Sequence, residues 1–135
     1  MSDTLMISII FVGVTIGIVF SYRLFMRGDT NAERVAKHLP PGFKPEWSWR
    51  HGDTYVGYEA ASDRLAIVDY PHGTVVKPRD VESIEAYDDG ELGIVHRWIA
   101  ITVPPQHKRY RLWCGMSVSR REAVLTHLKG ILAAR

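Results

Sequence analysis

The chain has 135 residues, of which 46% are hydrophobic and 24% are charged, and its formal net charge at pH 7 is +2. This composition is typical of one ordinary folded domain and argues against a disordered chain. A single cysteine, Cys114, excludes an internal disulfide framework and fits a reducing compartment.

The first predicted element is a run without charged residues from Leu5 to Phe20. A helix of about 20 apolar residues, rising about 1.5 Å per residue, spans the ~30 Å hydrocarbon core of a bilayer. A secretory signal peptide would need a basic start and a small-residue cleavage site, and the sequence has neither. A buried core helix of this length would need a larger protein around it. We therefore predict a transmembrane helix within residues 1–27.

Basic residues beyond this run indicate its orientation. The only charged residue before the apolar run is Asp3. Four basic residues follow the run, namely Arg23, Arg27, Arg34 and Lys37. Because positively charged flanks stay on the cytoplasmic side of a membrane, the C-terminal part is predicted to be cytoplasmic and the N-terminus to lie outside.

Small residues recur at a spacing of four within the predicted span. Gly13, Gly17 and Ser21 fall on one face of a helix, where another helix backbone can approach closely. We interpret this face as a packing surface for self-association or for a larger membrane protein. The alternative is that these glycines have no particular role, since glycine is common in membrane helices.

A juxtamembrane segment is predicted at residues 28–46. Thr30 and Glu33 form a capping box for a short helix over 31–38. The Pro-Pro-Gly sequence at 40–42 ends this helix and begins a proline-rich linker.

Short β-like runs separated by turns begin at residue 47. The clearest runs span 54–59, 64–70, 74–77, 81–87 and 109–114. The Asp88-Asp89-Gly90 sequence is the strongest hairpin signal. The stretch from Leu92 to Val103 is long enough for two short strands or for one bent strand, and the sequence does not decide between them.

The chain is predicted to end in an amphipathic helix. Ser119 and Glu122 form its capping box. Its apolar face contains Val124, Leu125, Leu128, Ile131 and Leu132. The predicted fold class is therefore α+β and mainly β, with a transmembrane helix at 1–27 and a domain at 47–135. In this domain, six or seven antiparallel strands form a small barrel or sandwich that the C-terminal helix caps.

Four runs and the terminal helix carry a resemblance to a known family. The runs are Tyr55-x-Gly57-Tyr58, Arg64-Leu65-Ala66-Ile67, Asp80-Val81-Glu82-Ser83-Ile84-Glu85 and Ile99-Ala100-Ile101-Thr102-Val103. Their order resembles the bacterial pleckstrin-homology-like (PH-like) domains of small single-span membrane proteins. The resemblance covers Trp47 to Arg135. It implies a bent antiparallel barrel with a C-terminal helix, and a domain that binds lipids, peptides or proteins and is not an enzyme.

Catalytic motifs are missing from the sequence. No pair of histidines has the spacing of a zinc motif, and there is no glycine-rich phosphate loop or Gly-x-Ser-x-Gly sequence. Cys114 is expected to be a small buried residue and not a nucleophile. We predict a protein that is not an enzyme and uses no cofactor or metal, although a metal site assembled from distant histidines stays an open alternative.

Basic and aromatic residues near the C-terminus form the candidate contact surface for lipid or protein. Its residues are Arg97, Lys108, Arg109, Arg111 and Trp113. In the run 109–114, alternation places Arg109, Arg111 and Trp113 on one side of a strand. Such a surface contacts phosphate or a partner protein, and nucleic acid is the less favoured ligand. The alternative is a solvated edge strand whose cations discourage pairing with another chain.

Together these features predict a scaffold or accessory subunit of a bacterial inner-membrane assembly. It would present a cytoplasmic PH-like domain, and its partner would be a membrane protein or a second copy bound through the transmembrane helix. The alternative is a sensor of anionic lipid or of another ligand, which would use Arg109, Arg111 and Trp113. The two hypotheses differ in whether a stoichiometric protein or bound lipid accompanies the chain.

Overall fold

The computed structural model describes residues 3, 6–10, 12, 14–18 and 30–134. The chain divides into two compact units, Met1–Glu33 and Arg34–Arg135. In the first unit, the described residues up to residue 18 are helical and exposed to solvent.

The predicted transmembrane helix is contradicted by the structure. Within the described part of the chain, no helix combines the length and the apolar character that crossing a membrane requires. The single-pass inner-membrane location depended on this helix and is corrected with it. Of the predicted packing face, Gly17 is helical and exposed, whereas Gly13 and Ser21 lie outside the described residues.

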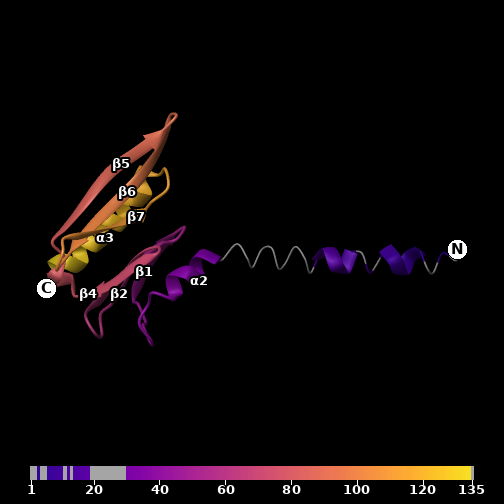
Figure 1. The fold of residues 1–135 in the computed structure, drawn as a ribbon, viewed down its shortest axis with the longest axis horizontal. Helices are drawn as coiled ribbons and strands as arrows, with labels where there is room; N and C mark the ends of the chain where they lie inside the picture. Colours follow the sequence, from indigo (N-terminus) through magenta and orange to yellow (C-terminus); the bar gives the residue numbers. More distant parts are fainter. Residues whose placement is uncertain (1–2, 4–5, 11, 13, 19–29, 135) are drawn as a thin grey trace. The chain divides into compact units, whose positions relative to one another are not determined.

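Antiparallel strands form two sheets between residues 47 and 113 (Figure 1). Sheet A has the order β1-β2-β3-β4, with β1 at Trp47–His51, β2 at Thr54–Glu59, β3 at Arg64–Asp69 and β4 at His72–Val76. Sheet B has the order β5-β6-β7, with β5 at Ser83–Glu91, β6 at Ile94–Val103 and β7 at Lys108–Trp113. The remaining elements are the helix α2 at Thr30–Ala36, the 3-10 turn η1 at Pro78–Asp80 and the helix α3 at Val118–Ala133.

The two sheets do not close into the predicted barrel. Strand pairing among the described residues stays within each sheet, so the barrel in the predicted fold class is wrong. The reason lies at the outer edge of β7. There the backbone N–H of Arg111 donates to the Asp69 carboxylate at 3.0 Å, and that of Trp113 donates to the Thr54 hydroxyl at 2.9 Å. Side chains of sheet A thus take donors that another strand would need to continue the ladder.

The hairpin between β5 and β6 turns later than predicted. Asp88, Asp89 and Gly90 all lie inside β5, and the turn is made by Leu92 and Gly93, with φ of 55° and 81°. A glycine adopts this left-handed backbone conformation without steric cost. The open question about 92–103 is answered by a single strand, β6, which begins at Ile94.

The main core lies between the two sheets and α3. Fully buried side chains come from all three layers, among them Val56, Leu65, Ile67, Ile99, Ile101, Leu112 and Leu128. The helix begins at an N-cap two residues earlier than predicted, because the Ser117 hydroxyl accepts the backbone N–H of Arg120 at 3.2 Å. The predicted core stripe of this helix is confirmed for Val124, Leu125 and Leu128.

A second, smaller core covers the other face of sheet A. Val35, which is buried, packs with Tyr55, Ala66 and Val68, and Leu39 and Phe43 pack against them. We call residues 34–46 the strap, because this segment covers the sheet. Part of the predicted juxtamembrane linker therefore belongs to the packed body of the second unit.

Candidate interaction face

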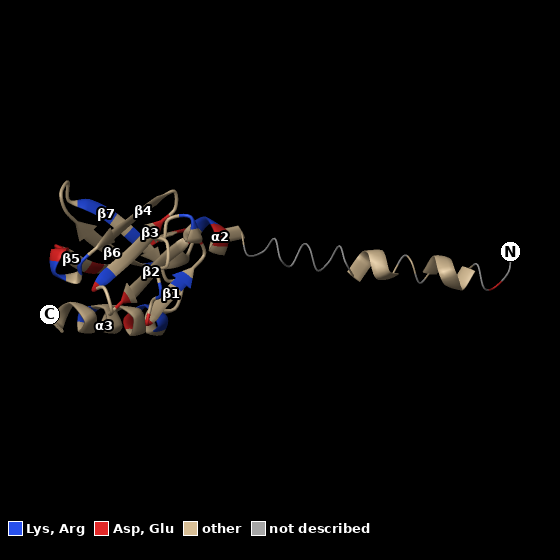
Figure 2. Ribbon diagram, turned by 90° about the horizontal axis from the view of Figure 1, so that it is seen from below, with Lys and Arg blue, Asp and Glu red and all other residues tan. Residues whose placement is uncertain are grey.

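The outer face of sheet B carries aromatic rings in strand register. Tyr87 lies opposite Trp98, and Trp98 lies opposite Trp113, so three strands each contribute one ring. Arg109 and Arg111 alternate with Trp113 along β7 and share its face, as the sequence predicted. We call these five residues the aromatic-arginine face. Figure 2 shows basic positions in blue along β7, which is separated from β5 by β6.

Each arginine of this face lies over a ring. The guanidinium carbon of Arg109 is 4.6 Å from the centre of the Tyr87 ring, and that of Arg111 is 4.9 Å from the Trp98 ring. The Tyr87 and Trp98 rings are nearly parallel, at 9°, with centres 6.2 Å apart. Cation-π contacts of this kind hold the two long side chains against the sheet, so less conformational freedom remains to be lost on binding.

Arg111 is also tied to sheet A. Its Nε is 3.6 Å from the Asp69 carboxylate, and its side chain is 48% exposed. Burial lowers the pKa of Arg111, but the charge of Asp69 and the Tyr87 hydroxyl outweigh it and raise that pKa above its ordinary value. The guanidinium stays charged and remains half open to solvent.

Two histidines flank Trp113 at the other end of the face. The Trp113 indole N–H donates to Nδ1 of His96 at 3.2 Å, and the His51 ring centre lies 4.6 Å from the Trp113 ring centre. Burial lowers the pKa of His51, and the nearby charges of Arg120 and Arg50 add to this. These contacts fix the indole ring in place, so it offers a rigid apolar surface.

Two of the five predicted contact residues do not belong to this face. Lys108 and Arg97 fall on the opposite side of sheet B, where alternation places them with the core residues. Arg97 donates to Asp88 at 2.5 Å, and Arg121 of α3 donates to the other carboxylate oxygen of Asp88. The hydrogen bond from Arg121, with the nearby charge of Arg97, lowers the pKa of Asp88 against the effect of burial. Arg97 is thus already paired. Asp88 of β5 connects Arg97 of β6 to Arg121 of α3.

Sequence analysis missed Tyr87, His51 and His96 as members of this cluster. The signal for Tyr87 was the hairpin register, since counting outward from a turn at Leu92 and Gly93 brings it opposite Trp98. The assumed turn at residues 88–90 concealed that pairing. No sequence signal placed His51 beside Trp113, because strands from different sheets meet there.

The single cysteine and the candidate metal ligands were also located in the structure. Burial raises the pKa of the Cys114 thiol to about 11, so the reactive thiolate is scarce at neutral pH. No group of three His, Cys, Asp or Glu side chains within the described ranges is placed to hold a metal ion.

Comparison with protein-family models, curated proteins and solved structures finds no match to this chain. The aromatic-arginine face therefore has to be interpreted from its own geometry, which suits contact with another molecule.

Proposed function

We propose that this chain is a non-enzymatic interaction protein whose aromatic-arginine face binds a partner protein. The observation that carries the proposal is the set of three half-buried aromatic rings, from three strands, with charged guanidinium groups lying over two of them. Trp, Tyr and Arg are the residue types that contribute most to binding energy in protein interfaces. Here the two arginines are exposed and lie against half-buried rings, so this face presents these residue types together.

The charge distribution favours a protein over an anionic membrane surface. Clusters of four to eight basic residues are typical of binding to acidic lipids. The outer face offers only Arg109 and Arg111, because Lys108 and Arg97 lie on the other side of the sheet. Glu85 and Asp89 share the outer face and would repel an anionic surface.

Single-stranded nucleic acid is also less favoured. Such ligands stack their bases on open aromatic rings. The rings of Tyr87 and Trp98 are each covered by an arginine, so a base would first have to displace a cation-π contact.

The resemblance to PH-like domains remains part of this proposal. A four-stranded sheet, a three-stranded sheet and a C-terminal helix follow one another along the chain, and this order supports the resemblance. Binding to peptides or proteins is among the functions that the resemblance implies.

Site-specific photo-crosslinking tests the proposal in the native cell. A benzoyl-phenylalanine residue replaces Arg109 on the face, and a control replaces Lys129, which is exposed on α3. We expect a discrete adduct with one protein from position 109 and none from position 129. Adding Trp98→Ala should weaken binding by about 30-fold, equivalent to about 2 kcal/mol. Arg111→Glu, a surface change that leaves the core intact, should also reduce the adduct.

Two results would overturn the proposal. One is equal crosslinking from positions 109 and 129. The other is binding of the purified chain to phosphatidylcholine vesicles that contain phosphatidylglycerol, lost in Arg109→Glu, without any protein adduct. That second result would support the anionic-lipid sensor in place of a protein-binding subunit.

A further inference from the structure

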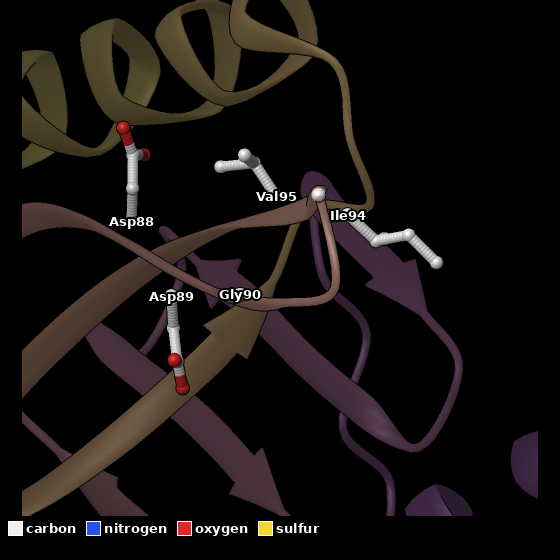
Figure 3. A pocket seen from close by; sticks show the side chains of 6 residues that line it. Asp88, Asp89, Gly90, Ile94 and Val95 are labelled. Carbon is white, nitrogen blue, oxygen red and sulfur yellow. The ribbon is translucent and has the colours of Figure 1, made fainter.

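The tip of the β5-β6 hairpin is an apolar projection. β7 pairs with β6 from Trp98 to Val103, and backbone hydrogen bonds of Arg97 with Cys114 and Gly115 continue this contact by one residue. Residues 89–95 extend beyond it as a two-stranded ribbon. At the tip, Leu92 is fully exposed, and Ile94 and Val95 are 52% and 40% exposed. Ile94 and Val95 point to opposite sides of the ribbon, next to Leu92 in the turn (Figure 3). Exposed apolar side chains gathered at one tip mark contact sites more often than isolated exposed residues do.

Acidic side chains surround this tip. Asp89 and Glu91 lie at exposed positions of β5, close to the turn. Asp88 and Asp89 point to opposite sides of the strand, with Asp88 directed toward α3 (Figure 3). Asp88 is therefore committed to Arg97 and Arg121, whereas Asp89 and Glu91 give the tip a negative rim. A surface that binds this tip should therefore have apolar residues at its centre and basic residues at its edges.

A groove beside β4 has this character. Its volume is about 570 Å³, and it is lined by the apolar residues Val75, Val76, Pro104 and Pro105, the basic residues Arg64, Lys77 and Arg79, and Asp80. Lys77 and Arg79 are exposed at its edge, while Arg64 is ion-paired with Glu59. β4 ends the order of sheet A, and Val75 is 38% exposed there.

We propose that the hairpin tip of one copy docks into the β4 groove of a second copy. Leu92 would enter the apolar floor, and Asp89 and Glu91 would face Lys77 and Arg79. The tip cannot enter the groove of its own copy, because they lie at opposite ends of β6. Ile94 begins this ten-residue strand and Pro104 follows its end, a separation of about 30 Å at about 3.3 Å per residue. Since the two surfaces differ, the contact is head-to-tail and can continue from copy to copy.

Disulfide trapping between two variants tests this contact. Leu92→Cys and Val75→Cys chains are purified at full length in a mild detergent, because the described apolar side chains at 6–18 are exposed. They are then mixed and oxidised, and the native Cys114 is buried and protected. We expect a mixed Leu92→Cys/Val75→Cys dimer. A matched control, Val118→Cys, is 45% exposed at the start of α3 and should trap about tenfold less.

Charge reversal then tests whether the acidic residues of the tip interact with the basic residues at the edge of the groove. Asp89→Lys with Glu91→Lys on the Leu92→Cys chain should reduce trapping about tenfold, because like charges would meet. Lys77→Glu with Arg79→Glu on the other chain should restore it. Association through the apolar N-terminal residues would be the same in all variants and cannot imitate this pattern.

The proposal is overturned if the mixed dimer does not exceed the Val118→Cys control, or if charge reversal leaves its yield unchanged. The proposal is supported if the mixed dimer is lost when Asp89 and Glu91 are changed to Lys, and is restored when Lys77 and Arg79 on the other chain are changed to Glu. All the altered side chains are exposed, and far-ultraviolet circular dichroism checks that each variant remains folded.

Discussion

At the scale of single residues, Glu59 is held by three donors. Its carboxylate accepts the backbone N–H of Lys44 at 2.6 Å, the Arg64 guanidinium at 2.7 Å and the Ser62 hydroxyl. The residue is only 7% exposed. The Lys44 hydrogen bond, followed by those from Ser62 and Arg64, lowers the pKa of Glu59 to about 2 despite some desolvation. The ionised carboxylate thus fastens the strap to the end of β2.

We predict that Glu59 makes the fold sensitive to acid. A carboxyl group whose pKa is lower in the folded chain than in the unfolded chain contributes stability above its unfolded value. That contribution should be fully present above about pH 4.5 and be lost as the pH falls toward about 2. Glu59→Gln should lower the free energy of unfolding at pH 7. It should also make the decrease of this free energy between about pH 4.5 and about pH 2 less steep.

Urea unfolding at a series of pH values measures this effect. Glu85→Gln, a change at an exposed position of β5, is the control and should follow the wild-type curve. A Glu59→Gln curve with the wild-type slope between pH 4.5 and 2 would contradict the assignment.

At the scale of elements, the strap determines how sheet A is covered. The aliphatic side chain of Val35 is 3% exposed and packs on Tyr55, Ala66 and Val68, while the ring of Phe43 lies under the Arg64 guanidinium at 5.8 Å. A strand of a sheet that is buried on both faces has a nearly continuous run of apolar residues. The strand β3, Arg-Leu-Ala-Ile-Val-Asp, has such a run at its four central positions. The absence of alternation in β3 follows from this double coverage.

We predict that Val35→Asp destabilises the second unit by about 2–5 kcal/mol, because a charge would be buried without a partner. Ala36→Asp is the matched control, since the neighbouring side chain is exposed on the same helix. Thermal unfolding of the full chain compares them. Equal losses in the two variants would mean that the strap contributes little to stability.

At the scale of the whole second unit, side chains join the two sheets where strand pairing stops. The Thr54 hydroxyl, 3% exposed, donates to the backbone carbonyl of His51 at 2.9 Å and accepts the N–H of Trp113. Asp69 accepts the N–H of Arg111 in the same way. These bonds satisfy an edge strand that would otherwise expose unpaired donors, and they position the Trp113 end of the aromatic-arginine face.

We predict that Thr54→Val, which keeps the shape but removes the acceptor, costs about 1–3 kcal/mol of stability. Because Trp113 would be less firmly held, the adduct from position 109 should also decrease. Thr126→Val, at an exposed position of α3 away from this face, is the control and should change neither quantity. Loss of the adduct with unchanged stability would point to a direct role of Thr54 in binding, contrary to this account.

The sequence by itself determined the local features of the fold. The strands β2 and β3 follow from short apolar runs bounded by turns. The strand β7, the C-terminal helix and the shared side of Arg109, Arg111 and Trp113 follow from periodicity over a few residues. Hydropathy over the first 27 residues led instead to a transmembrane helix that the structure contradicts.

Only the tertiary structure decided how these elements combine. The separation into two sheets depends on Thr54 and Asp69 meeting β7, and the aromatic-arginine face depends on a turn at Leu92 and Gly93 that brings Tyr87 opposite Trp98. Alternation along one strand shows which side chains share a side. It does not show which strand lies next to it, because that choice is made by contacts between residues far apart in the chain.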